Sequence, residues 1–167
     1  MFELKVAVSE KEEQKTAQKL CIILSKGSLD MVYPALILAT TGAGLGMEVH
    51  IFFTFWGLNA IVKGKVENLK ISAVGNPSLG LPSLIGMLPG MSAMVTRMMM
   101  KKFKEMKVPT VYELIKQAKD LDVKLHACST TMAALGIKES DLIPEVDDVV
   151  GASTFLTIAE NGQVIFI

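Results

Sequence analysis

The stretch QKLCIILS, from Gln18 to Ser25, is an almost continuous apolar run with the length of one β-strand. A strand with water on one face alternates apolar and polar residues, whereas a continuous run is typical of a strand buried on both faces. Such strands occur in parallel sheets that helices cover on both sides. The stretch therefore predicts an α/β fold.

The residues after this run have the spacing of a helix. Ser28 can cap its start, apolar residues recur at helical intervals from Met31, and glycines from Gly42 onward end it. Strands and helices then alternate along the chain. We expect further strands over Met47–Thr54, Leu69–Val74, Val123–Ala127 and Gln163–Ile167, a strand in the alternating N-terminal segment Phe2–Val8, and further helices over Trp56–Val62, Pro109–Lys119, Thr130–Leu135 and Ala152–Ala159.

This alternation predicts a three-layer α/β sandwich, flavodoxin- or Rossmann-like, with a mainly parallel sheet of about five strands and right-handed crossovers. The length of 167 residues, 50% of them hydrophobic, suits a single domain over residues 1–167. In open α/β sheets the ligand site lies beyond the carboxyl ends of the strands. Those ends carry Lys26, Trp56, Asn76 and Cys128, so we expect the functional residues among them.

The stretch KLHACSTTMAALGI, Lys124 to Ile137, places a cysteine between a strand and the helix that follows it. The start of a helix presents free N–H groups and partial positive charge, which stabilise a thiolate and lower a cysteine pKa from about 8.5. We therefore predict that Cys128 faces solvent as a reactive nucleophile. The alternative is a small residue that is tolerated before a helix.

Several neighbours could assist this thiol. Strand alternation places His126 on the same face as Cys128, where it could hold or donate a proton or be merely structural. Lys26, or the backbone N–H groups of Ser129 and Thr130, could stabilise a sulfur anion. Trp56 and Asn76 complete the accessory candidates at this edge of the sheet.

Other kinds of chemistry find little support in the sequence. Cys21 lies inside a buried run and is expected to behave as a small hydrophobe, too far from Cys128 for a disulfide. Two histidines and two separated cysteines give no zinc-like spacing, and neither a C-x-x-C motif nor a GxxxxGK[ST] nucleotide-binding motif is present. We expect no metal and no cofactor, and the sparse cysteines favour a reducing, cytoplasmic setting.

Charge and hydropathy exclude further classes of protein. The 17 basic and 17 acidic residues balance, which argues against nucleic-acid binding. The uncharged stretch Ile71–Thr96 has the length of a membrane span, but its three prolines and four glycines before Met91 would break such a helix. We expect a protein that does not span a membrane.

Seven of the eleven methionines fall between Met87 and Met106, and Met87, Met91, Met94 and Met98 form one stripe at helical spacing. They predict a Met/Pro/Gly-rich helical insertion over residues 77–108. The stripe could belong to a core or subunit-interface helix, or to a flap, hinged at Pro89-Gly90, that covers the sheet edge or docks a carrier protein. Peripheral membrane contact, helped by nearby lysines, is a third and not favoured interpretation.

The order of these elements, the segment FFTFWG at Phe52–Gly57 and the strand ending in HAC before STTMAALGI resemble the DsrE/DsrF-like family of sulfur-relay proteins, in its branch with a methionine-rich insertion. The resemblance covers most of Leu20–Ile167. It implies a cytoplasmic homo-oligomer, a trimer or hexamer, whose cysteine receives sulfur and passes it to a partner thiol. Only Cys128 matches the sulfur-bearing position. The implied partners are sulfur-donor and sulfur-acceptor proteins, such as rhodanese- or TusA-like carriers.

We therefore expect a cysteine-based sulfur carrier or sulfurtransferase that holds sulfur on Cys128 as a persulfide or thiosulfonate adduct. One alternative is a non-catalytic subunit that docks a partner or a membrane through its methionine-rich face. A thiol oxidoreductase is a weaker alternative, because no second cysteine is placed near Cys128 to resolve a disulfide.

Overall fold

The computed structural model describes residues 19–72 and 90–167. The N-terminal strand expected over Phe2–Val8, the candidate Asn76, the stripe residue Met87 and the proposed hinge at Pro89 lie outside the described residues.

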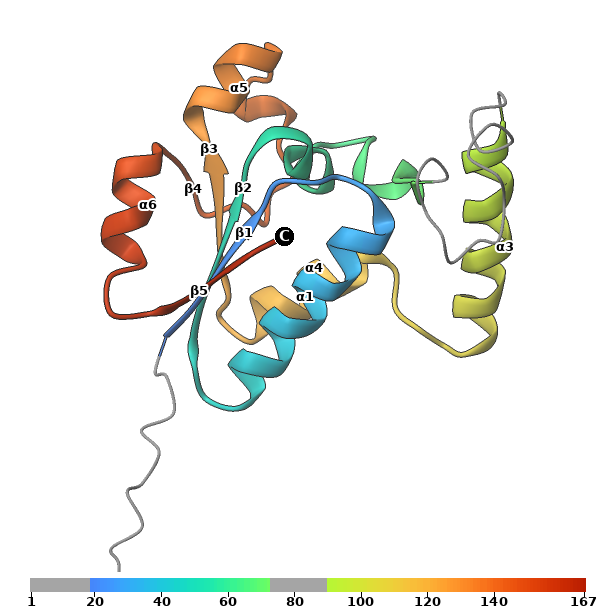
Figure 1. Ribbon diagram of the computed structural model, residues 1–167, viewed down its shortest axis with the longest axis horizontal. Coiled ribbons are helices and arrows are strands. Elements are labelled where there is room, and N and C mark those ends of the chain that lie inside the picture. Colours follow the sequence, from blue (N-terminus) through green and yellow to red (C-terminus); the bar gives the residue numbers. More distant parts are fainter. Residues whose placement is uncertain (1–18, 73–89) are drawn as a thin grey trace, which may run out of the picture.

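Five strands form a single sheet in the order β4-β3-β2-β1-β5, and every neighbouring pair is parallel (Figure 1). The central strands carry the apolar runs, and their side chains are almost all buried. This arrangement confirms the α/β fold with a parallel five-stranded sheet. The strands are β1 (Lys19–Leu24), β2 (Glu48–Phe53), β3 (Lys124–Cys128), β4 (Asp148–Val150) and β5 (Gln163–Phe166).

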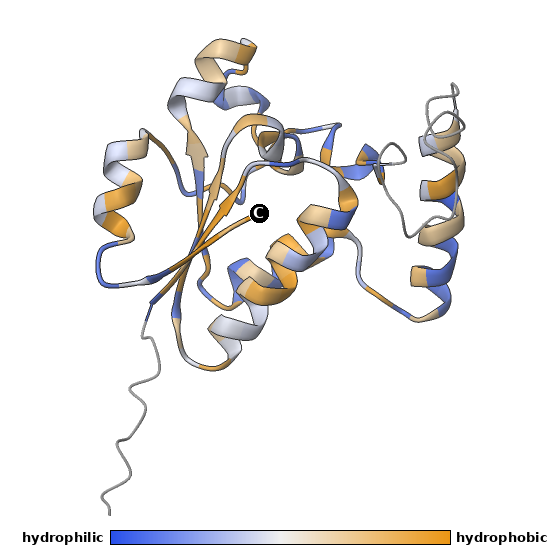
Figure 2. Ribbon diagram, viewed as in Figure 1, coloured by the Kyte–Doolittle hydropathy of each residue, from blue (hydrophilic) through white to orange (hydrophobic). Residues whose placement is uncertain are grey.

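Helices cover both faces of the sheet (Figure 1). Two of them, α1 and α4, pack side by side on one face, and α6 covers the other. The apolar residues concentrate along the strands, whereas a helix such as α3 mixes apolar and polar positions (Figure 2). The helices are α1 (Leu29–Gly44), α3 (Met91–Glu105), α4 (Val111–Asp120), α5 (Ser129–Leu135) and α6 (Ala152–Ile158), with short 3-10 helices η1 (Phe55–Ile61), η2 (Val66–Asn68) and η4 (Glu139–Asp141).

The two faces have hydrophobic cores of different size. The larger core lies under α1 and α4 and includes Leu36, Phe53 and Ile115. The smaller core lies under α6 and consists of Cys21, Phe52, Cys128, Phe155 and Ala159. The predicted sulfur-bearing cysteine is thus packed in the smaller core.

The prediction of a strand over Leu69–Val74 is wrong for Leu69–Ser72, the part that the structure describes, because these residues have no regular structure. The Lys70 carbonyl accepts a hydrogen bond from the Leu29 N–H at 3.0 Å, and the Ile71 N–H donates to Thr96 Oγ1 at 2.9 Å. These backbone groups therefore bond to α1 and α3 instead of to a neighbouring strand. The fifth strand is instead β4, a three-residue edge strand that the sequence did not predict.

Helix α3 confirms that the methionine-rich segment is partly helical, but two residues of its stripe do not face the core. Val95 is buried, and the Phe103 ring meets the Tyr33 ring edge-on with centroids 5.0 Å apart. Met94 and Met98 remain 59% and 56% exposed, so the interpretation of these two as core residues of this chain is wrong. That residues 77–108 form an insertion within one domain over residues 1–167 stays a prediction.

None of the helices in residues 19–72 and 90–167 combines the length and the apolar character that a membrane span requires.

Candidate functional site

Cys128 is the last residue of β3 and the N-cap of α5, so it lies at the strand–helix junction that the sequence predicted. Its exposure differs from the prediction: the residue is only 5% exposed. It belongs to the core under α6, in which the Phe52 and Phe155 rings stack with centroids 4.6 Å apart and Val150 packs alongside. The expectation of a solvent-facing thiol is therefore wrong, because α6 lies over this end of β3.

The sulfur atom receives a hydrogen bond from within its own helix. Thr131 Oγ1 donates to Cys128 Sγ at 3.3 Å. The same oxygen lies 3.1 Å from Thr54 Oγ1 and accepts from the Phe55 N–H at 3.3 Å. Because Thr131 uses its single proton on the sulfur, Thr54 must be the donor in the hydroxyl pair. A line of donors therefore points at Cys128.

These donors decide the ionisation of the thiol. Burial is the largest single influence on the pKa of Cys128 and raises it, but the hydroxyls of Thr131 and Thr54 and the backbone N–H groups of Thr131 and Thr130 lower it. Together the hydrogen bonds outweigh burial, so the pKa of Cys128 lies below its ordinary value. The thiolate, which is the nucleophilic form of a cysteine, is thus favoured at a buried position.

Cys21 has the opposite character. It is fully buried in β1, and burial raises the pKa of its thiol, which nearby Lys19 lowers less strongly and Glu48 raises further. Both cysteines are free thiols. Cys21 therefore matches the prediction of a small buried hydrophobe.

His126 lies on the same face as Cys128, and its ring approaches the Phe155 ring at 5.9 Å. Its nitrogens are directed elsewhere: Nε2 lies 2.9 Å from His50 Nδ1, and Nδ1 lies 2.6 Å from Asp148 Oδ1. His50 Nε2 in turn lies 2.8 Å from Glu48 Oε1. Both rings are buried, so a chain of two imidazoles joins two carboxylates across the sheet. The sequence analysis did not predict this hydrogen-bonded histidine pair.

Two other candidates, Lys26 and Trp56, line a groove of about 860 Å³. Cys128 is not among the residues that line this groove, so the structure does not bring them to the thiol. Thr130 is close enough for its backbone N–H to bond the sulfur, and Ser129 begins α5 directly after it.

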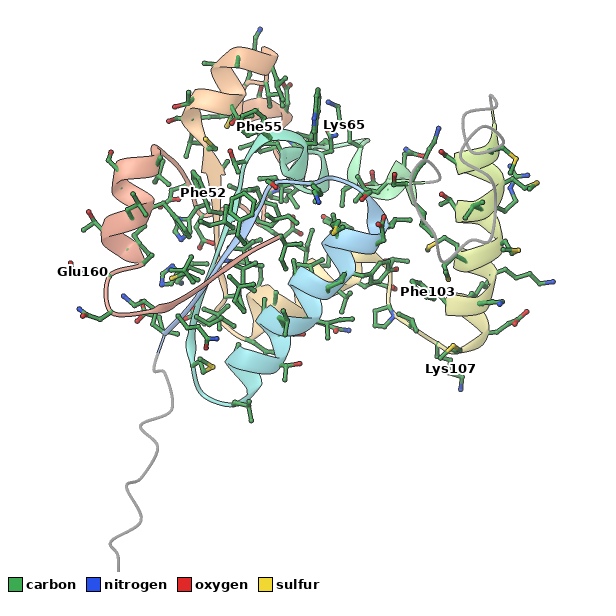
Figure 3. All side chains as sticks on the ribbon, in the orientation of Figure 1. Phe52, Phe55, Lys65, Phe103, Lys107 and Glu160 are labelled. Atoms are coloured by element: carbon green, nitrogen blue, oxygen red, sulfur yellow. The ribbon has the colours of Figure 1, made fainter. Side chains whose placement is uncertain are left out.

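Tight packing fixes the loop that carries Thr54 and Phe55. A Cβ on Gly57 would lie 2.1 Å from the Leu24 carbonyl oxygen, and a Cβ on Gly27 would lie 2.2 Å from that of Trp56, so the loops after β1 and β2 fit only with glycine at both positions. Phe55 has a left-handed backbone, with φ of 45°, which is strained for a bulky residue. Figure 3 labels Phe55 at this edge, beside α5. The loop is held where its N–H can reach Thr131.

The sequence analysis did not identify Thr54 and Thr131, although their positions gave partial indications. Thr54 directly follows a predicted strand, and Thr131 lies in the first turn of a predicted helix. Both positions border the expected site, but nothing in the sequence says that the two hydroxyls meet. Within the described residues no three His, Cys, Asp or Glu side chains cluster closely enough to hold a metal ion.

Comparison with known proteins gives concordant matches. A family model described as DsrE/DsrF/DrsH-like matches residues 16–167. The sulfur carrier protein DsrE2 of Allochromatium vinosum is 38% identical over 160 residues, which cover 91% of this chain and 97% of that protein. The uncharacterised protein YrkE of Bacillus subtilis is 33% identical over 157 residues, 88% of this chain and 94% of YrkE. The crystal structure of the ychN protein from E. coli aligns with a TM-score of 0.56 at 13% identity, covering 90% of this chain and 99% of ychN, which is a likeness of fold.

Proposed function

The chain belongs to the DsrE/DsrF/DrsH-like family, and from this premise we propose that it is a cysteine-based sulfur carrier of a sulfur relay, with Cys128 as the sulfur-bearing residue. The relative that is named a sulfur carrier protein supports the role in sulfur relay. The observation that carries the assignment to Cys128 is the line of donors from Thr54 and Thr131 to its sulfur, which favours the thiolate.

The proposed reaction exchanges one sulfur–sulfur bond for another. The Cys128 thiolate attacks the outer sulfur of a donor persulfide, R–S–SH, so that a bond from Sγ to this sulfur forms while the donor S–S bond breaks. The donor leaves as a thiolate, R–S⁻, and takes up a proton. In the second step an acceptor thiolate attacks the outer sulfur and releases Cys128 as a thiolate. No net oxidation or reduction takes place.

Thr131 serves both steps in the same way. Its hydroxyl stabilises the Cys128 thiolate before attack and again when Cys128 is the leaving group of the second step. A thiosulfonate adduct, in which the carried group is –SO₃⁻ on sulfur, is the second form that we propose for the cargo. We further propose cysteine-bearing donor and acceptor proteins, a cytoplasmic setting and assembly into a trimer or hexamer.

Intact-mass spectrometry of the full chain tests the proposal. After incubation with polysulfide or tetrathionate, we expect an adduct that a reductant removes in the wild type and in Cys21→Ser, and no adduct in Cys128→Ser. The Cys21→Ser variant is the matched control, because both substitutions remove one buried thiol. An adduct that disappears with Cys21 instead would show that the assignment to Cys128 is wrong.

A second candidate function is docking through the methionine-rich helix, which the exposure of Met94 and Met98 favours. Co-sedimentation with anionic-lipid vesicles, compared between the wild type and Met94→Gln/Met98→Gln, tests it. Sedimentation that the double substitution abolishes would support docking as a function of this face, and no sedimentation of either protein would count against membrane docking.

A further inference from the structure

The groove lined by Lys26 and Trp56 lies beyond the carboxyl ends of β1 and β2. In open α/β sheets ligands bind beyond the carboxyl ends of the strands. The residues Lys26, Gly27 and Ser28, directly after β1, line the groove. Cys128 lies at the end of β3, two strands away.

The groove is positively charged although the chain as a whole is neutral. Its lining contains Lys26, Lys65 and Lys70 against a single acidic residue, Asp30, so three positive charges face one negative charge. The Asp30 carboxylate accepts a hydrogen bond from the Ser72 N–H at 3.3 Å. Clustered charge of one sign in a concave site raises the local concentration of counter-ions.

Among the described residues, few groups bond to the lysine side chains of the groove. Lys65 Nζ donates to Asn59 Oδ1 at 3.2 Å. The ammonium groups of Lys26 and Lys70 have no hydrogen bond or ion pair within residues 19–72 and 90–167. The start of α1 adds little, because the Leu29 N–H is already bonded to the Lys70 carbonyl. The lysines, rather than the helix end, would therefore bind an anion.

Trp56 adds a flat apolar surface to this charge. It is the one tryptophan of the chain and is 60% exposed, although its backbone is held tightly against Gly27. An exposed indole on a fixed backbone can stack on a planar group with little loss of conformational entropy. The volume of about 860 Å³ is within the range of small-molecule sites, roughly 300–1,000 Å³.

We propose that this groove binds a small organic anion that carries at least two negative charges beside a flat ring, the class to which nucleoside phosphates belong. Lys26, Lys65 and Lys70 bind the charged part, and Trp56 stacks on the ring. The sequence lacks a glycine-rich phosphate loop, so in this groove lysine side chains take the place of backbone N–H groups. The site is separate from Cys128 and goes beyond the sulfur-carrier function.

A titration of the full-length protein with ADP tests the proposal, followed by Trp56 emission and by equilibrium dialysis. We expect saturable binding below millimolar concentration that weakens as salt is added, because salt screens exposed charges. Adenosine lacks the charges and pyrophosphate lacks the ring, so both should bind at least about tenfold more weakly, which corresponds to about 1.4 kcal/mol. Binding of pyrophosphate as tight as that of ADP would overturn the stacking role of Trp56.

Two double variants give the matched comparison. Lys65→Ala/Lys70→Ala removes two lysines of the groove and should weaken ADP binding about tenfold, whereas Lys101→Ala/Lys102→Ala removes two exposed lysines of α3 and should leave it unchanged. An equal loss in both variants, or no saturable binding of ADP to the wild type, would overturn the proposal. Sulfur loading of Cys128 in Lys65→Ala/Lys70→Ala should match the wild type, so a failure of this proposal remains distinguishable from a failure of the sulfur-carrier proposal.

Discussion

The side chain of Thr131 has one proton to donate and directs it to Cys128, while its oxygen accepts from Thr54 and from the Phe55 N–H. Donors that polarise one another in a buried site strengthen the final hydrogen bond. We therefore expect the reactivity of the buried thiol to depend on the Thr131 hydroxyl.

Thr131→Val should make Cys128 a poorer nucleophile at mildly acidic pH. The native pKa of Cys128 is lowered by the Thr131 hydroxyl, so loss of this donor raises the pKa and shrinks the thiolate fraction below it. A hydrogen bond to a charged group contributes about 1.5–3 kcal/mol, so we expect alkylation to slow at least about tenfold. The measurement is the rate of alkylation against pH in a Cys21→Ser background.

Thr131→Ser keeps the hydroxyl and should keep most of the rate, which separates the hydrogen bond from the packing of the methyl group. An unchanged pH profile in Thr131→Val would mean that the backbone N–H groups of the first turn of α5 suffice to stabilise the thiolate.

The buried pair of His50 and His126 gives a second prediction, which concerns the protons on the two rings. Each carboxylate, Glu48 and Asp148, needs an N–H from the imidazole it faces, and the contact between the two rings needs one proton more. One proton on each outer nitrogen and one between the two rings would satisfy all three contacts. Lys19 Nζ lies 3.8 Å from Glu48 Oε2.

Nitrogen NMR of the imidazole rings at neutral pH should show both outer nitrogens, His50 Nε2 and His126 Nδ1, protonated. In His126→Gln the contact between the two rings is lost, and the nitrogen signals of His50 should therefore change. Spectra in which either outer nitrogen lacks a proton in the wild type would contradict this arrangement, because a carboxylate would then face a bare nitrogen.

At the scale of elements, α6 covers Cys128 and packs on the sheet through a single buried side chain. Phe155 is the one side chain of this helix that is buried, and its ring stacks on Phe52 at an angle of 13° between the planes. Because Cys128 is buried beside Phe155, we expect the attachment of α6 to limit access to its sulfur.

Phe155→Leu should therefore expose Cys128 more often. A loss of about 1–2 kcal/mol in the packing of α6 raises the population of the open form, and with it the alkylation rate, roughly tenfold. Leu156→Ala, at a neighbouring position of α6 that is 65% exposed, is the matched control and should change little. Thermal unfolding of both variants checks that the effect is local; an unchanged rate in Phe155→Leu would mean that access takes another route.

Asp147 ties the end of α4 to the start of β3. Its carboxylate accepts hydrogen bonds from Lys119 Nζ at 2.6 Å and from the Leu125 N–H at 2.8 Å. Burial raises the pKa of Asp147, but the Leu125 N–H and Lys119 lower it more, so the pKa lies below its ordinary value.

Because the folded-state pKa of Asp147 is lowered, its contribution to stability is present above the pKa of the unfolded chain and is lost as pH falls through the folded-state value. Asp147→Asn should therefore be less stable than the wild type at pH 7, and the difference should shrink in acid. Urea unfolding at neutral and acidic pH measures this, with the exposed Asp120→Asn as control. A difference that grows in acid would contradict the assignment.

The elements differ in how far the sequence predicts them. Continuous apolar runs identified β1 and β2, and Thr110 with Glu113 forms the capping box that begins α4 where the sequence placed a helix. Leu69–Ser72 has the composition of a strand, but its hydrogen bonds go to α1 and α3, and three residues of β4 are too few to give a pattern. The order of strands and helices was enough to predict the place of Cys128. Its burial and its hydrogen bond to Thr131 depend instead on how α6 and the loop after β2 pack, and the spacing of apolar residues does not encode this packing.

On the scale of the whole molecule, α3 stands beside the α1 side of the domain (Figure 1), and Met99, Met100 and Phe103 pack against the larger core. Phe103 meets Tyr33, Thr96 accepts from Ile71, and Val95 is buried. We expect this helix to open separately from the sheet.

Phe103→Leu should speed hydrogen exchange of the α3 amides by roughly tenfold while the amides of β1 to β3 keep their protection, because a weakened contact raises the open population of α3 alone. Exchange followed by mass spectrometry of proteolytic peptides measures both regions, and Met98→Leu, at an exposed position of α3, is the control. Equal acceleration in the sheet would show that α3 and the sheet open as one unit.

The pairing of β1 with β5 bears on how the protein is made. Leu20 lies opposite Gln163 in the register, so the edge of the first described strand stays open until residues 163–166 have left the ribosome. During synthesis that edge is a row of unpaired backbone groups beside an apolar run, which is the kind of surface that nascent chains use to aggregate and that chaperones shield. Translation speed over the last third of the message should thus influence the yield of folded protein more than changes in α3 do.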